Sequence, residues 1–290
     1  MDTITTGIGG ALLAKALPEE TRGPAGVWAV TLAAVVPDAD VFANFLTSEP
    51  LARLAQHRSF THSLVGVVVL APVLALLLRR FGPDKRYRRL LALVLLGLGW
   101  HLFTDLATSW GTQVFYPFTR ERVVWDLLFI VDFTFTAILL LPQLLAWTYR
   151  QPAGAVRRGA LIWLFLVSFA ALVISTVAPL SEVSFRWELL AWLAALLAGL
   201  LVVPRLRDWG FQQSRATFCR LGIAMLALYL GLCAVAHLAA LGQVEKFAAA
   251  RGLTVEARAA LPRPFSPFRW SGLVLTPKGV YQSWFNVLEG

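Results

Sequence analysis

The stretch "SLVGVVVLAPVLALLL", residues 63–78, decides the fold, because it runs for sixteen residues without a charged side chain. A helix needs about 17 to 25 mostly apolar residues to cross the hydrocarbon core of a bilayer. Comparable apolar runs follow at residues 90–108, 123–147, 160–180, 187–203 and 221–241. The pattern therefore predicts six transmembrane helices.

The composition supports this interpretation. Of 290 residues, 58% are hydrophobic and 15% are charged, and the mean hydropathy is +0.66. Soluble globular domains have about 25% charged residues. Two weaker apolar runs, residues 4–17 and 27–36, predict one or two further short helices at the N-terminus. We therefore expect an all-α polytopic membrane protein in contact with membrane lipids.

The net charge of +9 follows from membrane topology better than from nucleic-acid binding. Twelve Lys and Arg lie in three segments between apolar runs, residues 79–89, 148–159 and 204–219. Only five lie in the segments that topology places on the opposite side, residues 37–62, 109–122 and 180–186. Because cytoplasmic loops carry the excess of Lys and Arg, the first set is predicted to be cytoplasmic. We expect no nucleic-acid partner.

Ionisable residues near a membrane span are costly, so their clustering is informative. Three of the four histidines of the chain lie in two short motifs, "HRSFTHS" at residues 57–63 and "HLFTD" at residues 101–105. The aspartates of "PDAD", residues 37–40, precede them. The predicted topology brings all three motifs to the extracytoplasmic ends of their helices. The candidate metal ligands are Asp38, Asp40, His57, His62, His101 and Asp105.

The spacing of these residues suits a metal site. His101 and Asp105 are four residues apart, so both project from one face of a helix. Ser63 and its neighbours are good N-cap types, which predicts a helix that starts within the motif and has His62 in its first turn. Pro37 is expected to leave the aspartates on an irregular loop. Histidine and aspartate ligands without cysteine suit Zn²⁺ first, then Mn²⁺ or Fe²⁺, as one or two ions.

Such a site supports hydrolysis through an activated water, with Asp38 or Asp105 as the candidate general base. Arg58 is a candidate substrate clamp, although a cation that reaches toward the membrane surface is the commoner role of such a residue. The alternatives for the whole cluster are a transporter or ion-binding site and a non-catalytic polar network. No second copy of the motifs occurs in residues 150–290, and this disfavours a transporter built from repeats. The fourth histidine, His237, is interpreted as a packing residue.

Together with "HLFTDLATSWGTQVFYPF" at residues 101–118 and "WDLLFIVD" at residues 125–132, these motifs resemble a known family. It is the membrane-bound metal-dependent hydrolase family that includes LexA-regulated inner-membrane proteins of bacteria. The resemblance covers about the first 145 residues. It implies a multi-pass protein of the bacterial inner membrane with a hydrolase activity. Members usually open with a Thr-His pair before a glycine, and Thr6 stands here in place of that histidine.

The last part of the chain changes in character. Two runs rich in β-formers, "RWSGLVLT" at residues 269–276 and "VYQSWFNV" at residues 280–287, flank a turn and predict a β-hairpin. We therefore divide the chain into a transmembrane domain, residues 1–242, with the His/Asp motifs in residues 1–145, and an extracytoplasmic tail, residues 243–290. This tail either covers the site as a lid or rests on the lipid surface.

Overall fold

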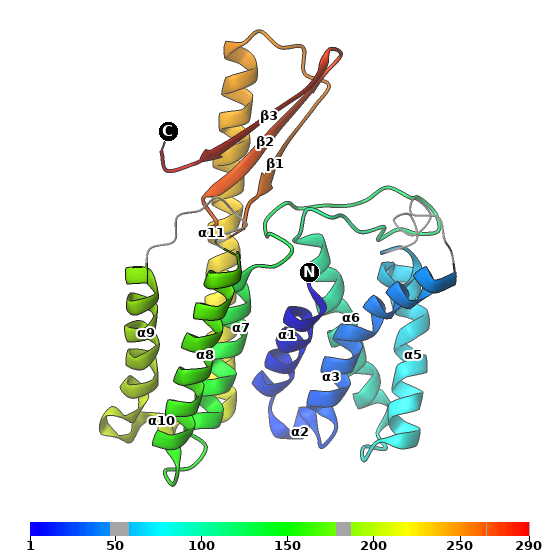
Figure 1. Ribbon diagram of the computed structural model, residues 1–290. Coiled ribbons are helices and arrows are strands. Elements are labelled where there is room, and N and C mark those ends of the chain that lie inside the picture. Colours follow the sequence, from blue (N-terminus) through cyan, green and yellow to red (C-terminus); the bar gives the residue numbers. More distant parts are fainter. Residues whose placement is uncertain (47–57, 178–186, 265, 290) are drawn as a thin grey trace. The chain divides into compact units, whose positions relative to one another are not determined.

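The computed structural model describes residues 1–46, 58–177, 187–264 and 266–289. The chain forms two compact units, one of Met1–Leu140 with Gly222–Gly290 and one of Leu141–Leu221. Its helices and strands are drawn in Figure 1. The helices of the N-terminal part are α1 (Thr3–Ala16), α2 (Glu19–Arg22), α3 (Gly26–Val35), α5 (Leu64–Phe81) and α6 (Tyr87–Leu106), with the 3-10 helices η1 (Val36–Leu46) and η2 (Phe60–His62).

The remaining helices and a small sheet follow. They are α7 (Phe133–Thr148), α8 (Ala155–Val177), α9 (Trp187–Val202), η4 (Val203–Asp208), α10 (Trp209–Gln212), α11 (Arg215–Ala250), β1 (Ala257–Pro262), β2 (Arg269–Thr276) and β3 (Gly279–Asn286). Among the described residues, five helical segments are long and apolar enough to cross a membrane: α5, α6, α8, Trp187–Gln212 and α11. The predicted class, a helical polytopic membrane protein with a small β-like tail, is confirmed.

The predicted span at residues 123–147 is wrong in its first half. Helix α7 begins only at Phe133 and has 16 residues, which makes it a shorter apolar helix. The preceding segment is extended, because its backbone bonds to the end of α6: Trp125 N–H donates to the Leu106 carbonyl at 2.9 Å. Asp132 then caps α7 by accepting from Phe135 N–H at 2.9 Å. The apolar composition of residues 123–147 therefore does not reveal that an extended segment is followed by a helix from Phe133.

Helices α1, α3, α5 and α6 pack side by side, as Figure 1 shows. Their contacts are made by small residues that let backbones approach closely. A Cβ atom at Gly97 of α6 would lie 2.7 Å from Ala33 Cβ of α3, and one at Gly10 of α1 would lie 2.8 Å from Ala34 Cβ. Such small residues are typical of helix contacts in membranes. This packing fixes the end of α3 against α6, where the polar motifs meet.

Two local expectations about the motifs need correction. Helix α3 ends at Val35, before Pro37, but the chain continues as 3-10 turns, so Asp38 lies on η1 rather than on an irregular loop. Ser63 is the N-cap of α5 and accepts from Gly66 N–H at 2.9 Å. His62 therefore precedes the first turn of this α-helix and lies in η2.

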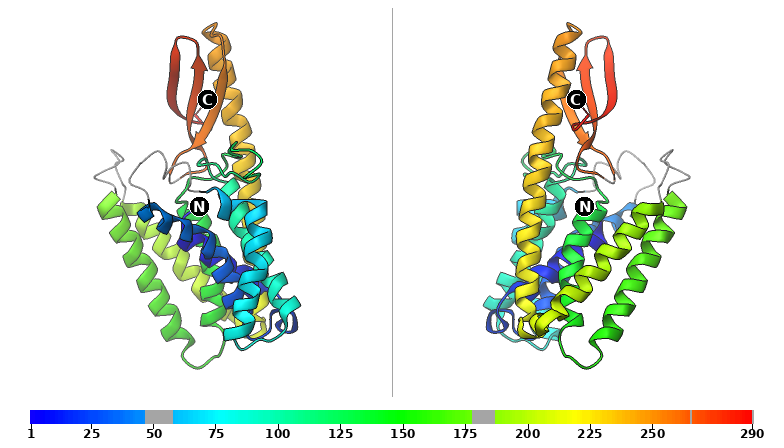
Figure 2. Two further views of the ribbon diagram at one scale, coloured as in Figure 1. Left: turned by 90° about the vertical axis from the view of Figure 1, so that its right-hand side faces the viewer. Right: turned by 90° about the vertical axis from the view of Figure 1, so that its left-hand side faces the viewer.

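The C-terminal hairpin is confirmed as β2 and β3, and β1 adds a third antiparallel strand in the order β1-β2-β3. Helix α11 continues to Ala250, so the expected boundary between the transmembrane domain and the tail, after residue 242, lies inside this helix. The sheet lies along the end of α11 (Figure 2), with the fully buried Trp270 packed among small and branched residues of this helix, Ala236, Ala240 and Val244.

In the unit Leu141–Leu221, Tyr149 packs between the rings of Phe211 and Phe218. Arg158 closes the turn between α7 and α8 by donating to the carbonyls of Thr148 and Ala153.

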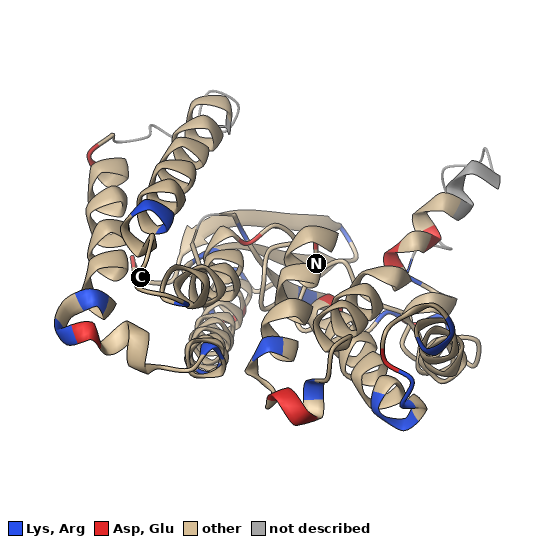
Figure 3. Cartoon of the chain, turned by 90° about the horizontal axis from the view of Figure 1, so that it is seen from below, with Lys and Arg blue, Asp and Glu red and all other residues tan. Residues whose placement is uncertain are grey.

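Figure 3 shows Lys and Arg, in blue, mainly in the turns that connect apolar helices. This is the pattern on which the topology prediction rests.

Candidate metal centre

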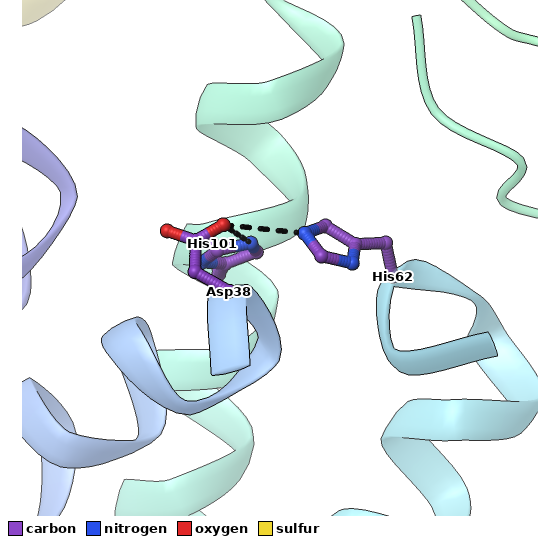
Figure 4. Close-up of side chains that lie close together, drawn as sticks. All are labelled: Asp38, His62 and His101. Atoms are coloured by element: carbon purple, nitrogen blue, oxygen red, sulfur yellow. Dashed lines mark hydrogen bonds and ion pairs between the residues drawn. The ribbon is translucent and has the colours of Figure 1, made fainter. Parts of the chain in front are cut away.

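Three side chains from separate segments converge in the N-terminal unit. Asp38 of η1, His62 of η2 and His101 of α6 each offer one ligand atom, and these atoms all lie within 4.8 Å of one another. Figure 4 shows both imidazoles directed toward the Asp38 carboxylate. His62 and His101 are fully buried, whereas the Asp38 side chain is 14% exposed. The structure thus brings together one residue from each predicted motif.

Asp105 borders the same group. Its Oδ2 atom lies 3.4 Å from His62 Nε2 and 3.5 Å from His101 Nε2. Asp38 Oδ1 lies 3.4 Å and 3.6 Å from the same two nitrogens. Tetrahedral ligands that are about 2.0 to 2.2 Å from one ion are roughly 3.3 to 3.6 Å apart. The four nitrogen-to-oxygen separations fall in that range, and the contact between His62 Nε2 and Asp38 Oδ1 is a long hydrogen bond.

A backbone contact fixes the orientation of His101. Its Nδ1 atom lies 2.7 Å from the Ala34 carbonyl oxygen. Because a carbonyl only accepts, Nδ1 carries the proton, and the neutral imidazole then presents the lone pair of Nε2 to the carboxylates. Among the described residues, buried His101 Nε2 and Asp105 Oδ2 have no hydrogen-bond partner.

His62 is held in a comparable way. Its Nδ1 atom lies 2.9 Å from Thr61 Oγ1 and 3.4 Å from Asp40 Oδ2, and its Nε2 atom faces the cluster. Burial lowers the pKa of His62 and favours the neutral ring, which is the form that binds metals. Asp40 therefore lies outside the three-residue group, on the far side of the imidazole, where a carboxylate orients a metal-binding histidine.

The charge of Asp38 is also stabilised by its neighbours. Burial by itself raises the pKa of this carboxyl group, but the hydrogen bonds with His62 and with the hydroxyl of Thr3 hold it below its ordinary value. Thr3 Oγ1 donates to Asp38 Oδ2 at 2.6 Å. Asp38 is thus ionised at neutral pH, as a metal ligand must be.

The other oxygen of Asp105 forms ion pairs with two positively charged groups of the chain. Its Oδ1 atom lies 2.6 Å from the amino group of Met1 and 3.1 Å from Arg58 Nη2. Arg58 is buried, with 2% of its surface exposed, and donates from Nη1 to Thr108 Oγ1 at 3.3 Å. A guanidinium that is buried against a carboxylate is not a cation reaching for the membrane surface, so this alternative for Arg58 does not apply.

The other residues that the sequence singled out lie away from this three-residue group or outside the described residues. His57 lies outside the described residues. His237 stacks on Trp270 with a centroid distance of 5.3 Å, as expected of a packing residue. Thr6 is buried in α1 and donates to the carbonyl of Asp2. The sequence did not single out Thr3 or Ala34, because a hydroxyl and a backbone carbonyl carry no signal until their neighbours are known.

A metal ion fits this donor set. Two imidazole nitrogens and two carboxylate oxygens are ligands that Zn²⁺, Mn²⁺ and Fe²⁺ accept. Buried polar atoms without partners are rare in native proteins, and two of them, His101 Nε2 and Asp105 Oδ2, face the centre of the group. A cation between them would satisfy both. Asp38, His62 and His101 are the residues that could hold it.

Comparisons with known proteins agree with the fold. Residues 1–178 match the family model described as YdjM inner membrane protein. The chain is 29% identical over 139 residues to the uncharacterized protein YfhP of Bacillus subtilis (strain 168), and the match covers 46% of this chain and 42% of the relative. No solved structure matches significantly. The matched residues contain the whole His/Asp cluster, and the chain belongs to the YdjM inner membrane protein family.

Proposed function

We propose that the protein is an integral membrane metal-dependent hydrolase. Asp38, His62 and His101 bind a divalent cation, Zn²⁺ by preference, and Asp105 Oδ2 lies beside this site. The substrate is a lipid or an envelope-derived ester or phosphoester. The donor atoms and their spacing support the cation site, and the location of the cluster at a helix end supports the substrate class.

One observation carries the proposal: His101 Nε2 faces two carboxylates, which only accept hydrogen bonds, while His101 Nδ1 is bonded to a backbone carbonyl. The Ala34 carbonyl fixes the tautomer, and the Asp38 and Asp105 oxygens lie 3.6 and 3.5 Å from Nε2. Acceptors that face one another in a buried site are unfavourable without a cation between them. A proton on His101 Nε2 would also satisfy these acceptors. A measurement of the metal content of the protein distinguishes a bound proton from a bound metal ion.

The chain supplies the groups for hydrolysis. A divalent cation bound here supplies Lewis acidity and a water molecule with a lowered pKa. Asp38 is the better candidate for the general base, because its side chain is 14% exposed, whereas Asp105 is fully buried and bonded to Arg58 and Met1. Asp40 and the Ala34 carbonyl orient the imidazoles. Arg58 neutralises Asp105 and is available to bind the ester or phosphoester group of the substrate.

The depth of the site supports a lipid-derived substrate. Helix α6 begins at Tyr87, directly after Lys85 and Arg86, and His101 lies fourteen residues further along, which is roughly 21 Å at 1.5 Å per residue. If the basic end is cytoplasmic, the cluster lies near the extracytoplasmic boundary of the inner membrane, at the depth of lipid headgroups.

Turnover in a reconstituted membrane tests this function. The purified protein is placed in proteoliposomes, stripped with a chelator, resupplied with Zn²⁺, Mn²⁺ or Fe²⁺, and assayed by mass spectrometry for hydrolysis of phospholipids and other lipid esters. We expect metal-dependent product that is lost in His62→Ala and retained in the matched variant His237→Ala. Ion flux without turnover would instead support a transporter, and a metal-free, inactive protein would support a scaffold.

A further inference from the structure

A second set of polar atoms without partners includes the side chain of Arg58, which contacts Asp105 beside the candidate metal centre. Among the described residues, the buried atoms Arg58 Nε, Ser109 Oγ and Thr112 Oγ1 have no hydrogen-bond partner. Arg58 Nε is only a donor, and both hydroxyls can donate. An acceptor would satisfy all three. The atoms around His101 that the cation would satisfy are a separate set.

The loop after α6 wraps around Arg58. Thr108 Oγ1 accepts from Arg58 Nη1 at 3.3 Å, and Gln113 N–H donates to the Arg58 carbonyl at 3.1 Å. Ser109 and Thr112 lie between these two contacts in the sequence. The unpartnered hydroxyls therefore belong to the segment that encloses this guanidinium.

A second arginine joins this loop from the other side. Arg122 donates from Nη1 to the Gly111 carbonyl at 3.2 Å, and the next residue, Val123, pairs with Thr112 through two backbone hydrogen bonds of 3.0 and 3.1 Å. Burial, followed by the positive charge of Arg58, lowers the pKa of Arg122. The charges of Arg58 and Arg122 are thus close enough to act on the same bound anion.

The backbone of Arg58 is strained in support of this arrangement. Its φ of 60° is left-handed, a conformation that non-glycine residues rarely adopt. Two contacts hold it: the Arg58 N–H donates to Asp40 Oδ2 at 3.0 Å, and its carbonyl accepts from Gln113. Backbone strain that is held by neighbours is a feature of functional sites.

We infer that Arg58 and Arg122, with the hydroxyls of Ser109 and Thr112, form an anion subsite beside the metal centre, and that the substrate is a phosphoester rather than a carboxylic ester. The inference rests on the proposed function. Arg58 Nη2 lies 3.1 Å from Asp105 Oδ1, and the other oxygen of that carboxylate faces both imidazoles. A phosphoryl group bound to the guanidiniums therefore lies next to the cation. Arginine forks match phosphate oxygens, whereas a neutral carboxylic ester offers no charge for them.

The reaction balances without a redox partner. The oxygen of a water molecule forms a new bond to phosphorus, and Asp38 takes one proton of that water. The ester P–O bond breaks, its electron pair goes to the alcohol oxygen, and that oxygen takes up the proton that Asp38 accepted. Arg58 and Arg122 bind the non-bridging oxygens, where negative charge concentrates.

Binding of inorganic phosphate tests the subsite independently of turnover. Isothermal titration measures phosphate binding to detergent-purified full-length protein, with and without one equivalent of Zn²⁺, and elemental analysis measures zinc in parallel. We expect phosphate to bind the zinc-loaded protein and Arg122→Gln to weaken this binding by about tenfold or more while zinc content stays unchanged. Arg120→Gln is the control, because it removes the same charge from an exposed position of the same loop.

The outcomes separate the two claims. If zinc binds but Arg122→Gln has no larger effect than Arg120→Gln, the anion subsite is overturned and the metal centre stands. If zinc does not bind but phosphate binding still depends on Arg122, the subsite stands and the proposed function fails. Arg58→Lys is a second variant that keeps the charge next to Asp105 and loses the fork. It should bind phosphate more weakly yet retain zinc, and equal phosphate binding by this variant would contradict the role of Arg58.

Discussion

His101 Nε2 and Asp105 Oδ2 lie 3.5 Å apart, one helical turn from each other on α6, and neither has a hydrogen-bond partner in the described part of the chain. The other nitrogen of His101 is bonded to the Ala34 carbonyl at the end of α3. The helix packing therefore aims the second ring nitrogen of His101 at a carboxylate, an arrangement that a cation completes.

Replacement of Asp40 tests the orientation of His62. Asp40→Asn keeps an acceptor for the Arg58 N–H, so the turn is preserved, but it removes the negative charge 3.4 Å from His62 Nδ1. We expect the affinity for Zn²⁺, measured by competition with a chelating dye, to fall by about 10- to 100-fold. The control is Asp208→Asn at an exposed position with a φ of 54°, which asparagine tolerates. Equal affinities in both variants would remove Asp40 from the site.

Two glycines of α6 test the packing that places His101. Gly97→Ala puts a methyl group 2.7 Å from Ala33 Cβ and against the Val30 carbonyl, so we expect a loss of about 1 to 3 kcal/mol and weaker zinc binding. Gly99→Ala meets nothing within 4 Å and should stabilise the helix by up to about 1 kcal/mol. Thermal unfolding in detergent checks both variants. A stable Gly97→Ala variant with normal zinc binding would contradict the contact between α3 and α6.

The turn between α5 and α6 has an acid-sensitive contact. Asp84 accepts from the N–H of Arg86 at 3.0 Å and from Arg89 Nε at 2.6 Å. Burial raises the pKa of Asp84, but these donors outweigh it and hold the pKa below its ordinary value. The unfolded carboxyl group therefore binds a proton at higher pH than the folded one does, so the stabilisation is present above about pH 4 and is lost as the pH falls through the lowered value.

We expect Asp84→Asn to lower the melting temperature at pH 7 and to reduce its decrease between pH 5 and pH 3. Glu256→Gln, at an exposed carboxylate of the C-terminal part, should leave both quantities unchanged. An unaltered acid profile in Asp84→Asn would show that this carboxyl group does not contribute to stability at all.

The sequence predicted the membrane helices and most of the cluster because these features depend on local patterns. Apolar runs identified α5, α6 and α8, and the four-residue spacing of His101 and Asp105 placed both on one face of α6. Motif order and topology brought Asp38 and His62 to the same end, and their side chains meet there.

Features that depend on tertiary contacts could not be predicted. The apolar run before α7 is extended because it bonds to the end of α6, and composition does not reveal such a partner. The position of Asp40 behind the His62 imidazole depends on the course of η1, for which an irregular loop was expected. Arg122 was counted only as a loop cation, since its relation to Arg58 arises from the folding of the intervening loop.

The metal content of the purified protein tests the central claim most directly. Elemental analysis after dialysis against trace Zn²⁺, Mn²⁺ and Fe²⁺ should find close to one ion or more per chain in the unchanged protein and almost none in His101→Ala. His237→Ala, which changes a histidine that stacks on Trp270, should match the unchanged protein. A folded, unchanged protein that holds no metal, or a His101→Ala variant that holds as much as the control, would contradict the account.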